Sequence, residues 1–318
     1  MRITACTVAA LLAVITRSAH AQCIYVTGAA PLGTHRTEVV LVRDAGQTTM
    51  TIASGYDGPA QPFAMVVPID ADITTADVSV GSREAFDALA LEDAPRLVEY
   101  WEQDPCGHYE EHAPVKRTGS KVPRPVERGR DGGAPPAIAP DREFEIVVKS
   151  GDVKQWLMDQ GYVVSSETAL ALDPLTKPSM RFVVAKVDPE RMQLESGHAS
   201  LTPLRVHFTS PSFGLRALVD GDLVVHALGR RQRYEVVNRR DESVPTNLDI
   251  RANAKEDFDA AYAALLSDVA TRVPDTVVTE YAHSLETLSS RDLASFGADA
   301  SGDWVVTRLH TKLSLIHI

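Results

Sequence analysis

Cysteine and basic residues are scarce in this chain, and long apolar runs are nearly absent. Only three of the 318 residues are Cys, and 32 Lys and Arg stand against 43 Asp and Glu, which gives a net charge of −11. A chain this acidic repels phosphate backbones and anionic membrane surfaces, so nucleic acid is excluded as a partner. Beyond residue 21 no apolar run reaches the roughly 18 residues of a membrane-spanning helix, so no membrane span is predicted there.

Common catalytic motifs are missing as well. The sequence has no Gly-x-Ser-x-Gly, no His-Glu-x-x-His, no Gly-Lys-Ser/Thr phosphate loop and no dinucleotide glycine fingerprint. The apolar fraction of 44% and the charged fraction of 24% are typical of a globular protein with a sizeable core. Together these features favour a non-catalytic protein, and no cofactor is predicted.

The first 21 residues have the pattern of a secretory signal peptide. Arg2 supplies a positive start, residues 6–15 form a short apolar run, and Ala19-His20-Ala21 is a small-x-small cleavage site. The sequence therefore predicts export, to the periplasm or the cell surface.

Two cysteines remain after the signal peptide, Cys23 and Cys106. Cys23 does not follow a lipobox, because His20 and Gln22 occupy the positions where that motif has Leu and a small residue. Exported proteins fold in an oxidising compartment. We therefore predict a disulfide between Cys23 and Cys106.

The chain divides into two structured halves. Residues 22–113 are predicted to be β-rich with one helix, residues 114–141 form a flexible linker rich in Pro and Gly, and residues 142–312 form an α+β half. The order of the elements and the hairpin-like spacing predict an α+β fold, with antiparallel or mixed sheets and a few packed helices. The predicted strands are 38–42, 48–53, 63–69, 144–148, 181–187, 204–209, 222–227, 232–237, 276–282 and 304–310.

Three helices carry capping signals. Ser82 precedes a helix with Phe86 and Leu89 on its buried side, and Asp152 precedes a second, shorter helix. The strongest helical period covers residues 254–272, where Asn253 and Glu256 are predicted to form a capping box.

One cluster has the spacing of a metal site. His108, Glu111 and His112 spell His-x-x-Glu-His, in which two imidazoles on one helix face would bind Zn²⁺ and the carboxylate would activate water. Pro105, Gly107 and Pro114 leave room for barely one helical turn. A solvated loop is therefore the preferred interpretation, and no metal site is predicted.

Other polar clusters also have plain structural interpretations. Asp70, Asp72 and Asp77 offer oxygens to Ca²⁺ but lack the Gly and Glu of an EF-hand, so an acidic exposed loop is favoured. His226 is expected to be a buried or half-buried neutral imidazole, and Trp101 and Trp156 are expected to anchor the core.

A basic group lies between residues 230 and 240. We expect a solvated hairpin face with acidic counter-charges at Glu235, Asp241 and Glu242, and the alternative is a docking patch for an anionic glycan or an acidic partner. The basic residues are Arg230, Arg231, Arg233, Arg239 and Arg240.

Several segments together resemble a secreted bacterial family called domain of unknown function 2330. The resemblance covers residues 23–312 and implies export and an α+β body, but it implies no activity and no catalytic residues. The segments are Tyr56-Asp57-Gly58-Pro59, Phe63-Ala64-Met65-Val66-Val67-Pro68, Phe86-Asp87-Ala88-Leu89, Asp222-Leu223-Val224-Val225-His226, Gln232-Arg233-Tyr234-Glu235-Val236 and Pro245-Thr246-Asn247-Leu248-Asp249.

The expected role is non-catalytic binding or scaffolding in the cell envelope, with an envelope protein or a glycan as partner. The alternative is a metal-dependent envelope hydrolase with its site near His108 and His112.

The end of the chain has an unusual sequence. Leu-Ser-Leu-Ile-His-Ile at 313–318 is what the end of a common transposase sequencing adapter encodes, and the strand at 304–310 has no following turn or partner. We therefore expect residues 313–318 to be an adapter artefact, the natural gene to continue past Lys312, and the strand at 304–310 to have an incomplete edge.

Overall fold

The computed structural model describes most of the chain outside the N-terminal segment and residues 98–142. The predicted signal peptide, Cys23, Cys106, the His108/Glu111/His112 cluster and the linker at 114–141 lie outside the described residues. The described ranges are 24–28, 33–34, 36–97, 143–192, 194–195, 198–210, 214–215, 221–237, 239–244, 257–273 and 276–313.

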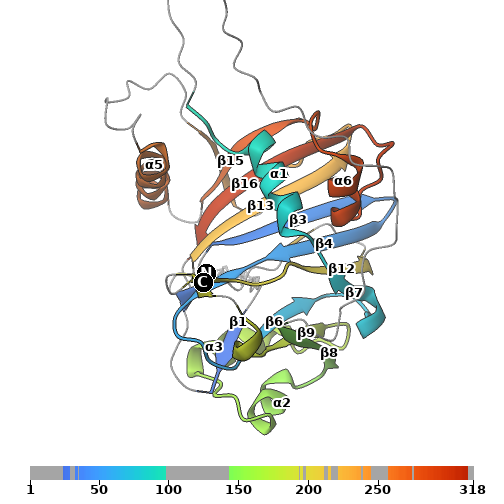
Figure 1. Ribbon diagram of the computed structural model, residues 1–318, viewed down its shortest axis with the longest axis vertical. Helices are drawn as coiled ribbons and strands as arrows, with labels where there is room; N and C mark the ends of the chain where they lie inside the picture. Colours follow the sequence, from blue (N-terminus) through green and yellow to red (C-terminus); the bar gives the residue numbers. More distant parts are fainter. Residues whose placement is uncertain are drawn as a thin grey trace, which may run out of the picture.

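Two large sheets dominate the fold, which is α+β with antiparallel and mixed sheets, as predicted (Figure 1). The eight-stranded sheet has the order β14 (Arg240–Ser243), β15 (Thr276–Ser284), β16 (Trp304–Leu313), β13 (Gly221–Arg230), β3 (Thr37–Asp44), β4 (Gln47–Ala53), β12 (Leu204–Thr209) and β7 (Val78–Val80). The four-stranded sheet has the order β1 (Ile24–Thr27), β6 (Phe63–Ile69), β9 (Arg181–Val187) and β8 (Phe144–Ser150). A smaller sheet has the order β10 (Leu194–Glu195), β11 (His198–Ser200), β5 (Gly55–Asp57) and β2 (Gly33–Thr34).

Strands from before and after residues 98–142 alternate within the sheets. β3 pairs with β13 in parallel, β4 pairs with β12, and β6 pairs with β9. The segments predicted as two halves therefore build common sheets.

The main core lies between the two large sheets. Val39 and Leu41 of β3 and Met50 and Ile52 of β4 contribute from the larger sheet, and Met65 of β6 contributes from the smaller one. These positions alternate along each strand because successive side chains point to opposite faces. The predicted hairpin of β3 and β4 is confirmed, and its turn has positive φ at Ala45 and Gly46, as a two-residue hairpin turn requires.

Helices cover the outer faces of both sheets. α2 (Val153–Asp159) and α3 (Ser166–Leu172) pack on the outer face of the four-stranded sheet through Val153, Leu157 and Leu172. α1 (Arg83–Asp93) and α6 (Ser290–Phe296) lie across the outer face of the eight-stranded sheet (Figure 1). Short 3-10 turns occur at Thr75–Asp77, Asp173–Leu175 and Pro189–Arg191.

α1 begins and packs as its sequence predicts. The Ser82 hydroxyl accepts from the Ala85 N–H at 3.2 Å, and Phe86 and Leu89 are buried. The helix ends on two acidic residues that are also buried, Glu92 and Asp93. Buried carboxylates are uncommon unless they are paired, and both of these have partners on other elements.

Two predicted elements differ in the structure. Residues 232–237 do not form a strand, because the chain turns at Arg231, which has a φ of 56°, and Tyr234 N–H then donates to Thr307 Oγ1 at 2.9 Å. The long helix, α5 (Phe258–Arg272), starts later than predicted, and its N-cap is Asp257, which accepts from Ala260 N–H at 3.1 Å. Asn253 and Glu256 lie outside the described residues.

The expectation of an incomplete edge at residues 304–310 is wrong. β16 is an interior strand that pairs antiparallel with β13 on one side and with β15 on the other. Its partners come from earlier in the sequence, so β16 needs no later strand to complete its pairing. Among the residues that the structure describes, no helix is long and apolar enough to cross a membrane.

Candidate functional site

The outer face of the eight-stranded sheet changes character along its strands. Under α1 and α6 it is apolar, with Leu228 of β13 and Val306 of β16 side by side. One step further along the same face, His226 lies beside Arg308, and Val224 then lies beside His310. Because side chains alternate with a period of two, these residues share one face, and its far end is charged.

Asp93 connects α1 to this charged end. Its Oδ2 lies 2.6 Å from His226 Nδ1, and its Oδ1 accepts from Arg308 Nη1 at 2.9 Å. The Asp93 side chain is fully buried, and those of His226 and Arg308 are 2% and 4% exposed. A carboxylate at this depth is tolerated because both its oxygens face donors.

Glu280 lies in the same layer, at a β-bulge of β15. The register of β15 against β16 shifts between Thr279 and Tyr281, so Glu280 has no cross-strand partner. Its Oε2 accepts from Arg308 Nε at 2.6 Å, and its Oε1 accepts from His310 Nδ1 at 2.5 Å and from the Tyr262 hydroxyl at 2.7 Å. One fully buried carboxylate thus holds two cations and a phenol.

His310 connects these buried contacts to the surface. Its Nε2 donates to Asp222 Oδ1 at 2.6 Å, and Asp222 is about half exposed. Asp222 Oδ2 lies 3.7 Å from Arg36 Nε, and Glu38 Oε1 lies 3.5 Å from the same nitrogen. We call the connected set the ionic chain, and it consists of Asp93, His226, Arg308, Glu280, His310 and Asp222.

The contacts within the ionic chain fix the protonation states of its members. Burial alone would lower the pKa of His310, but the hydrogen bonds to Asp222 and Glu280 outweigh burial and raise it. Burial alone would raise the pKa of Glu280, but the hydrogen bond and charge of His310 and the charge of Arg308 lower it to about 2. Both nitrogens of His310 face carboxylates, so the ring is an imidazolium between two anions.

The pKa values of Tyr262 and Asp222 are also shifted by burial and by neighbouring groups. Burial and the nearby Glu280 charge raise the pKa of Tyr262, which therefore stays protonated and donates. Burial opposes ionisation of Asp222, but the hydrogen bond from His310 lowers its pKa below the ordinary value.

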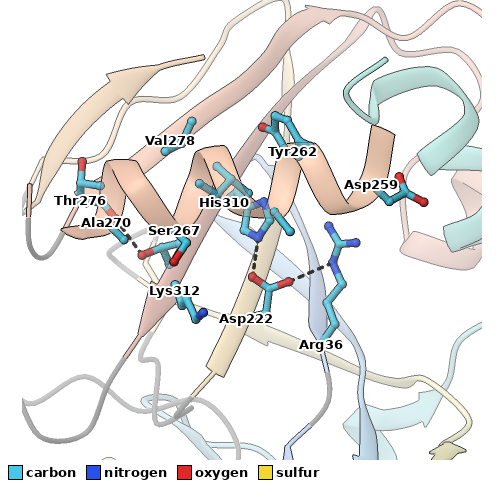
Figure 2. A pocket seen from close by; sticks show the side chains of 13 residues that line it. Arg36, Asp222, Asp259, Tyr262, Ser267, Ala270, Thr276, Val278, His310 and Lys312 are labelled. Atoms are coloured by element: carbon cyan, nitrogen blue, oxygen red, sulfur yellow. Dashed lines mark hydrogen bonds and ion pairs between the residues drawn. The ribbon is translucent and has the colours of Figure 1, made fainter. Parts of the chain in front are cut away.

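A cavity of about 440 Å³ opens between α5 and the charged end of the sheet. Figure 2 shows Asp222 at its centre, with His310 above it and with Arg36 and Lys312 on either side. α5 forms the opposite wall. The lining residues of α5 are Asp259, Tyr262, Ala263, Leu266, Ser267 and Ala270.

The acidic residues considered for Ca²⁺ each have a different partner. Asp70 accepts from Ser179 at 2.7 Å, Asp72 pairs with Arg181 at 2.6 Å, and Asp77 caps the turn at Thr74. Within the described ranges, no group of three or more His, Cys, Asp or Glu side chains has the arrangement of a metal site.

The basic group at 230–240 is engaged by acidic residues. Arg230 pairs with Asp44 at 2.7 Å and with Asp299, and its guanidinium lies over the Trp304 ring at 4.7 Å. Arg231 pairs with Asp303 at 2.7 Å.

Glu235 is a counter-charge as predicted, since it pairs with Arg233 at 3.3 Å. Asp241 instead accepts from the Thr279 hydroxyl at 2.7 Å.

The sequence also predicted the surroundings of His226, Trp156 and Trp101. His226 is buried, as predicted, but its carboxylate partner Asp93 was not foreseen. Trp156 is half-buried against the helices on the four-stranded sheet, and the Lys149 ammonium lies 4.9 Å from its ring centroid. Trp101 lies outside the described residues.

Sequence reasoning missed most of the ionic chain. A signal was present, because Arg308 and His310 occupy the same face of a predicted strand as Trp304 and Val306. Two charged residues on the apolar side of a strand call for buried partners, but the sequence does not identify those partners.

Comparisons with known proteins include a match to a family and a match to a distant solved structure. A profile of a family described as an uncharacterized protein conserved in bacteria (DUF2330) matches residues 18–315. The crystal structure of baculovirus P35 aligns at 9% identity with a TM-score of 0.36, covering 89% of this chain and 95% of that one. No curated protein matches the chain.

Proposed function

Because the chain belongs to this uncharacterized family of bacterial proteins, we propose a function from its own residues: it is an exported envelope protein that binds a small polar ligand in the cavity beneath α5, without chemically transforming it. The N-terminal segment with Arg2 and the Ala19-His20-Ala21 site supports export to the periplasm or the cell surface.

The observation that carries the proposal is that the ionic chain holds one wall of the cavity rigidly. Asp222 is fixed by His310 at 2.6 Å, and His310 is fixed in turn by Glu280 at 2.5 Å. Binding sites gain affinity when such partners hold the contacting groups in place before the ligand arrives. The volume of about 440 Å³ is within the usual range for small-molecule sites.

The same contacts favour binding over catalysis. A general base needs a free lone pair that faces the substrate. Both nitrogens of His310 and both oxygens of Glu280 are occupied by hydrogen bonds within the protein. Proton transfer by His310 or Glu280 would require breaking a buried ion pair, which costs several kcal/mol.

A matched pair of variants tests the proposal. Ala263 lines the cavity and Ala264 does not, although both are exposed on α5. Ala263→Trp fills the cavity, whereas Ala264→Trp adds the same bulk elsewhere on the helix. Native mass spectrometry of the full chain against envelope metabolites should find a ligand whose affinity falls at least tenfold in Ala263→Trp alone. Equal binding by both variants would place the ligand elsewhere and refute the proposal.

A further inference from the structure

We propose that the ligand of this cavity is a small organic anion, a carboxylate or a phosphate monoester with a short aliphatic body, whose anionic group binds between Arg36 and Lys312. This inference rests on the proposed binding function and specifies the chemistry of its ligand.

The guanidinium of Arg36 faces the cavity with nitrogens that are available to a ligand. Its Nε lies 3.5 Å from Glu38 and 3.7 Å from Asp222, which is too long for a hydrogen bond. Its two terminal nitrogens have no hydrogen bond or ion pair to any other residue that the structure describes. The side chain is 37% exposed and lines the cavity. A guanidinium edge of this kind suits the paired oxygens of a carboxylate or a phosphate.

Lys312 supplies a second cation on the other side of Asp222. It is opposite Asp222 in the register of β13 and β16, and it is exposed and lines the cavity. Within the described part of the chain it forms no ion pair. Figure 2 shows Lys312 and Arg36 flanking Asp222 beneath α5. An anion placed there would meet donors from both sides.

The two carboxylates of the cavity do not cancel this preference. The charge of Asp222 is partly offset by the His310 imidazolium, which donates to it at 2.6 Å. Asp259 lies in the first turn of α5, where the helix dipole stabilises a negative charge. Both acidic groups therefore have an intramolecular explanation, whereas the Lys312 ammonium and the terminal nitrogens of Arg36 have no hydrogen bond to any residue that the structure describes.

The α5 wall determines the rest of the ligand. Ala263, Leu266 and Ala270 present an apolar surface opposite the cations. The cavity has the volume of roughly 15 water molecules, at about 30 Å³ each. A short aliphatic chain attached to the anionic group would lie along this wall.

The test uses three probes of similar length on the full chain, measured by isothermal titration calorimetry. Butyl phosphate and pentanoate should bind, and butylammonium should not. Arg36→Gln/Lys312→Gln should weaken anion binding at least tenfold, and adding 0.5 M NaCl should weaken it in the parent protein. The matched control is Arg191→Gln/Lys177→Gln, which removes two surface cations that do not line the cavity and should leave binding unchanged.

The outcomes separate the two proposals. If butylammonium binds, with loss in Ala263→Trp, the cavity is a ligand site but the anionic preference is wrong. If the anions bind equally to the parent and to Arg36→Gln/Lys312→Gln, the assignment of these two residues is overturned. If no probe binds and no envelope metabolite depends on Ala263, both proposals fail. Circular dichroism of each variant establishes that a loss of binding is not a loss of fold.

Discussion

Glu280 Oε1 lies 2.5 Å from His310 Nδ1, at the point where a bulge interrupts the pairing of their strands. In regular antiparallel pairing, residues 279 and 281 of β15 would oppose positions two apart on β16, whereas here they oppose the consecutive residues Leu309 and Arg308. Glu280 is the extra residue, and its carboxylate lies in the same layer as Arg308 and His310. The bulge therefore lies at the centre of the ionic chain.

Loss of the Glu280 charge should destabilise the protein strongly. Glu280→Gln leaves the Arg308 and His310 cations without their shared anion in a buried layer. We expect the free energy of unfolding to fall by about 3 kcal/mol, the low end of the cost of removing one partner of a buried pair. Urea denaturation measures this change.

The control for that substitution is Glu145→Gln on β8. Glu145 pairs with Lys186 at 3.0 Å, but 68% of its side chain is exposed. Exposed pairs contribute about 0–1 kcal/mol, so this variant should be nearly neutral. Equal losses in the two variants would contradict the special role of Glu280.

Stability should pass through a maximum in mildly acidic solution. The pKa of Glu280 is lowered from 4.5 to about 2, so its contribution is present above pH 4.5 and is lost as the pH falls towards 2. The pKa of His310 is raised above 6.5, so its contribution is complete below pH 6.5 and is lost as the pH rises through the higher folded value. The ionic chain therefore stabilises most between about pH 4.5 and 6.5.

His310→Gln provides the check on this profile. Without the imidazole, the decline in unfolding free energy above pH 6.5 should be smaller than in the parent, and the acid limb should shrink as well, because His310 contributes most to lowering the pKa values of Glu280 and Asp222. Denaturant titrations at half-unit pH intervals would resolve the two limbs. A variant with an unchanged alkaline decline would show that another group causes it.

Asp93 and His226 should be energetically coupled. Their side chains meet at 2.6 Å with almost no exposure, so each single substitution removes the same contact. A double-mutant cycle with Asp93→Asn and His226→Gln should give an interaction energy of about 1–3 kcal/mol. Additive effects would mean that the contact contributes little to stability.

Gly297 should tolerate no side chain. It follows α6 with a φ of 84°, and an added Cβ would lie 2.8 Å from Thr49 Cγ2. Gly46 has nearly the same φ, 86°, with no atom within 4 Å of an added Cβ. Gly46→Ala should therefore cost only the backbone strain, about 1–2 kcal/mol, and Gly297→Ala should cost clearly more. Thermal denaturation of the two variants compares them directly.

The disulfide between Cys23 and Cys106 stays a prediction of the sequence. In the chain-entropy model, closing a loop of roughly 80 residues stabilises the fold by about 4–5 kcal/mol. Thiol labelling of the unreduced protein should find no reactive cysteine in the mature chain. Two labelled thiols per mature chain would exclude the bridge.

Local signals predicted local structure well. The hairpin of β3 and β4 follows from the turn at residues 44–47, and α1 follows from its Ser82 cap. The predicted strand at 232–237 failed because Gly229 and Arg231 fold the chain back sharply. The Tyr234 ring packs so closely on Gly229 that a Cβ there would lie 2.7 Å from it. Alternating residue types cannot reveal such a close approach.

The candidate site depended on information that the sequence does not contain. His226 was expected to be buried, but the partner Asp93 is 133 positions away on a helix. Glu280 lies at a bulge, which shifts the alternation on which strand prediction relies. Arg308 and His310 were on a predicted strand whose neighbours were thought to be missing. In each of these cases the neighbours of the residue come from distant parts of the chain, and local sequence patterns do not encode them.

The position of β16 in the sheet order has a consequence for assembly. β14 and β15 connect to the rest of the eight-stranded sheet only through β16. Residues 304–313 therefore hold this end of the sheet together. A chain that ends before Trp304 would lose β16 and, with it, the attachment of β14 and β15 to the sheet. It would also lose the cations Arg308 and His310. During synthesis, β14 and β15 cannot join the rest of this sheet until residues 304–313 have been made. Such late, long-range closure is slow and leaves strand edges exposed to aggregation until β16 arrives.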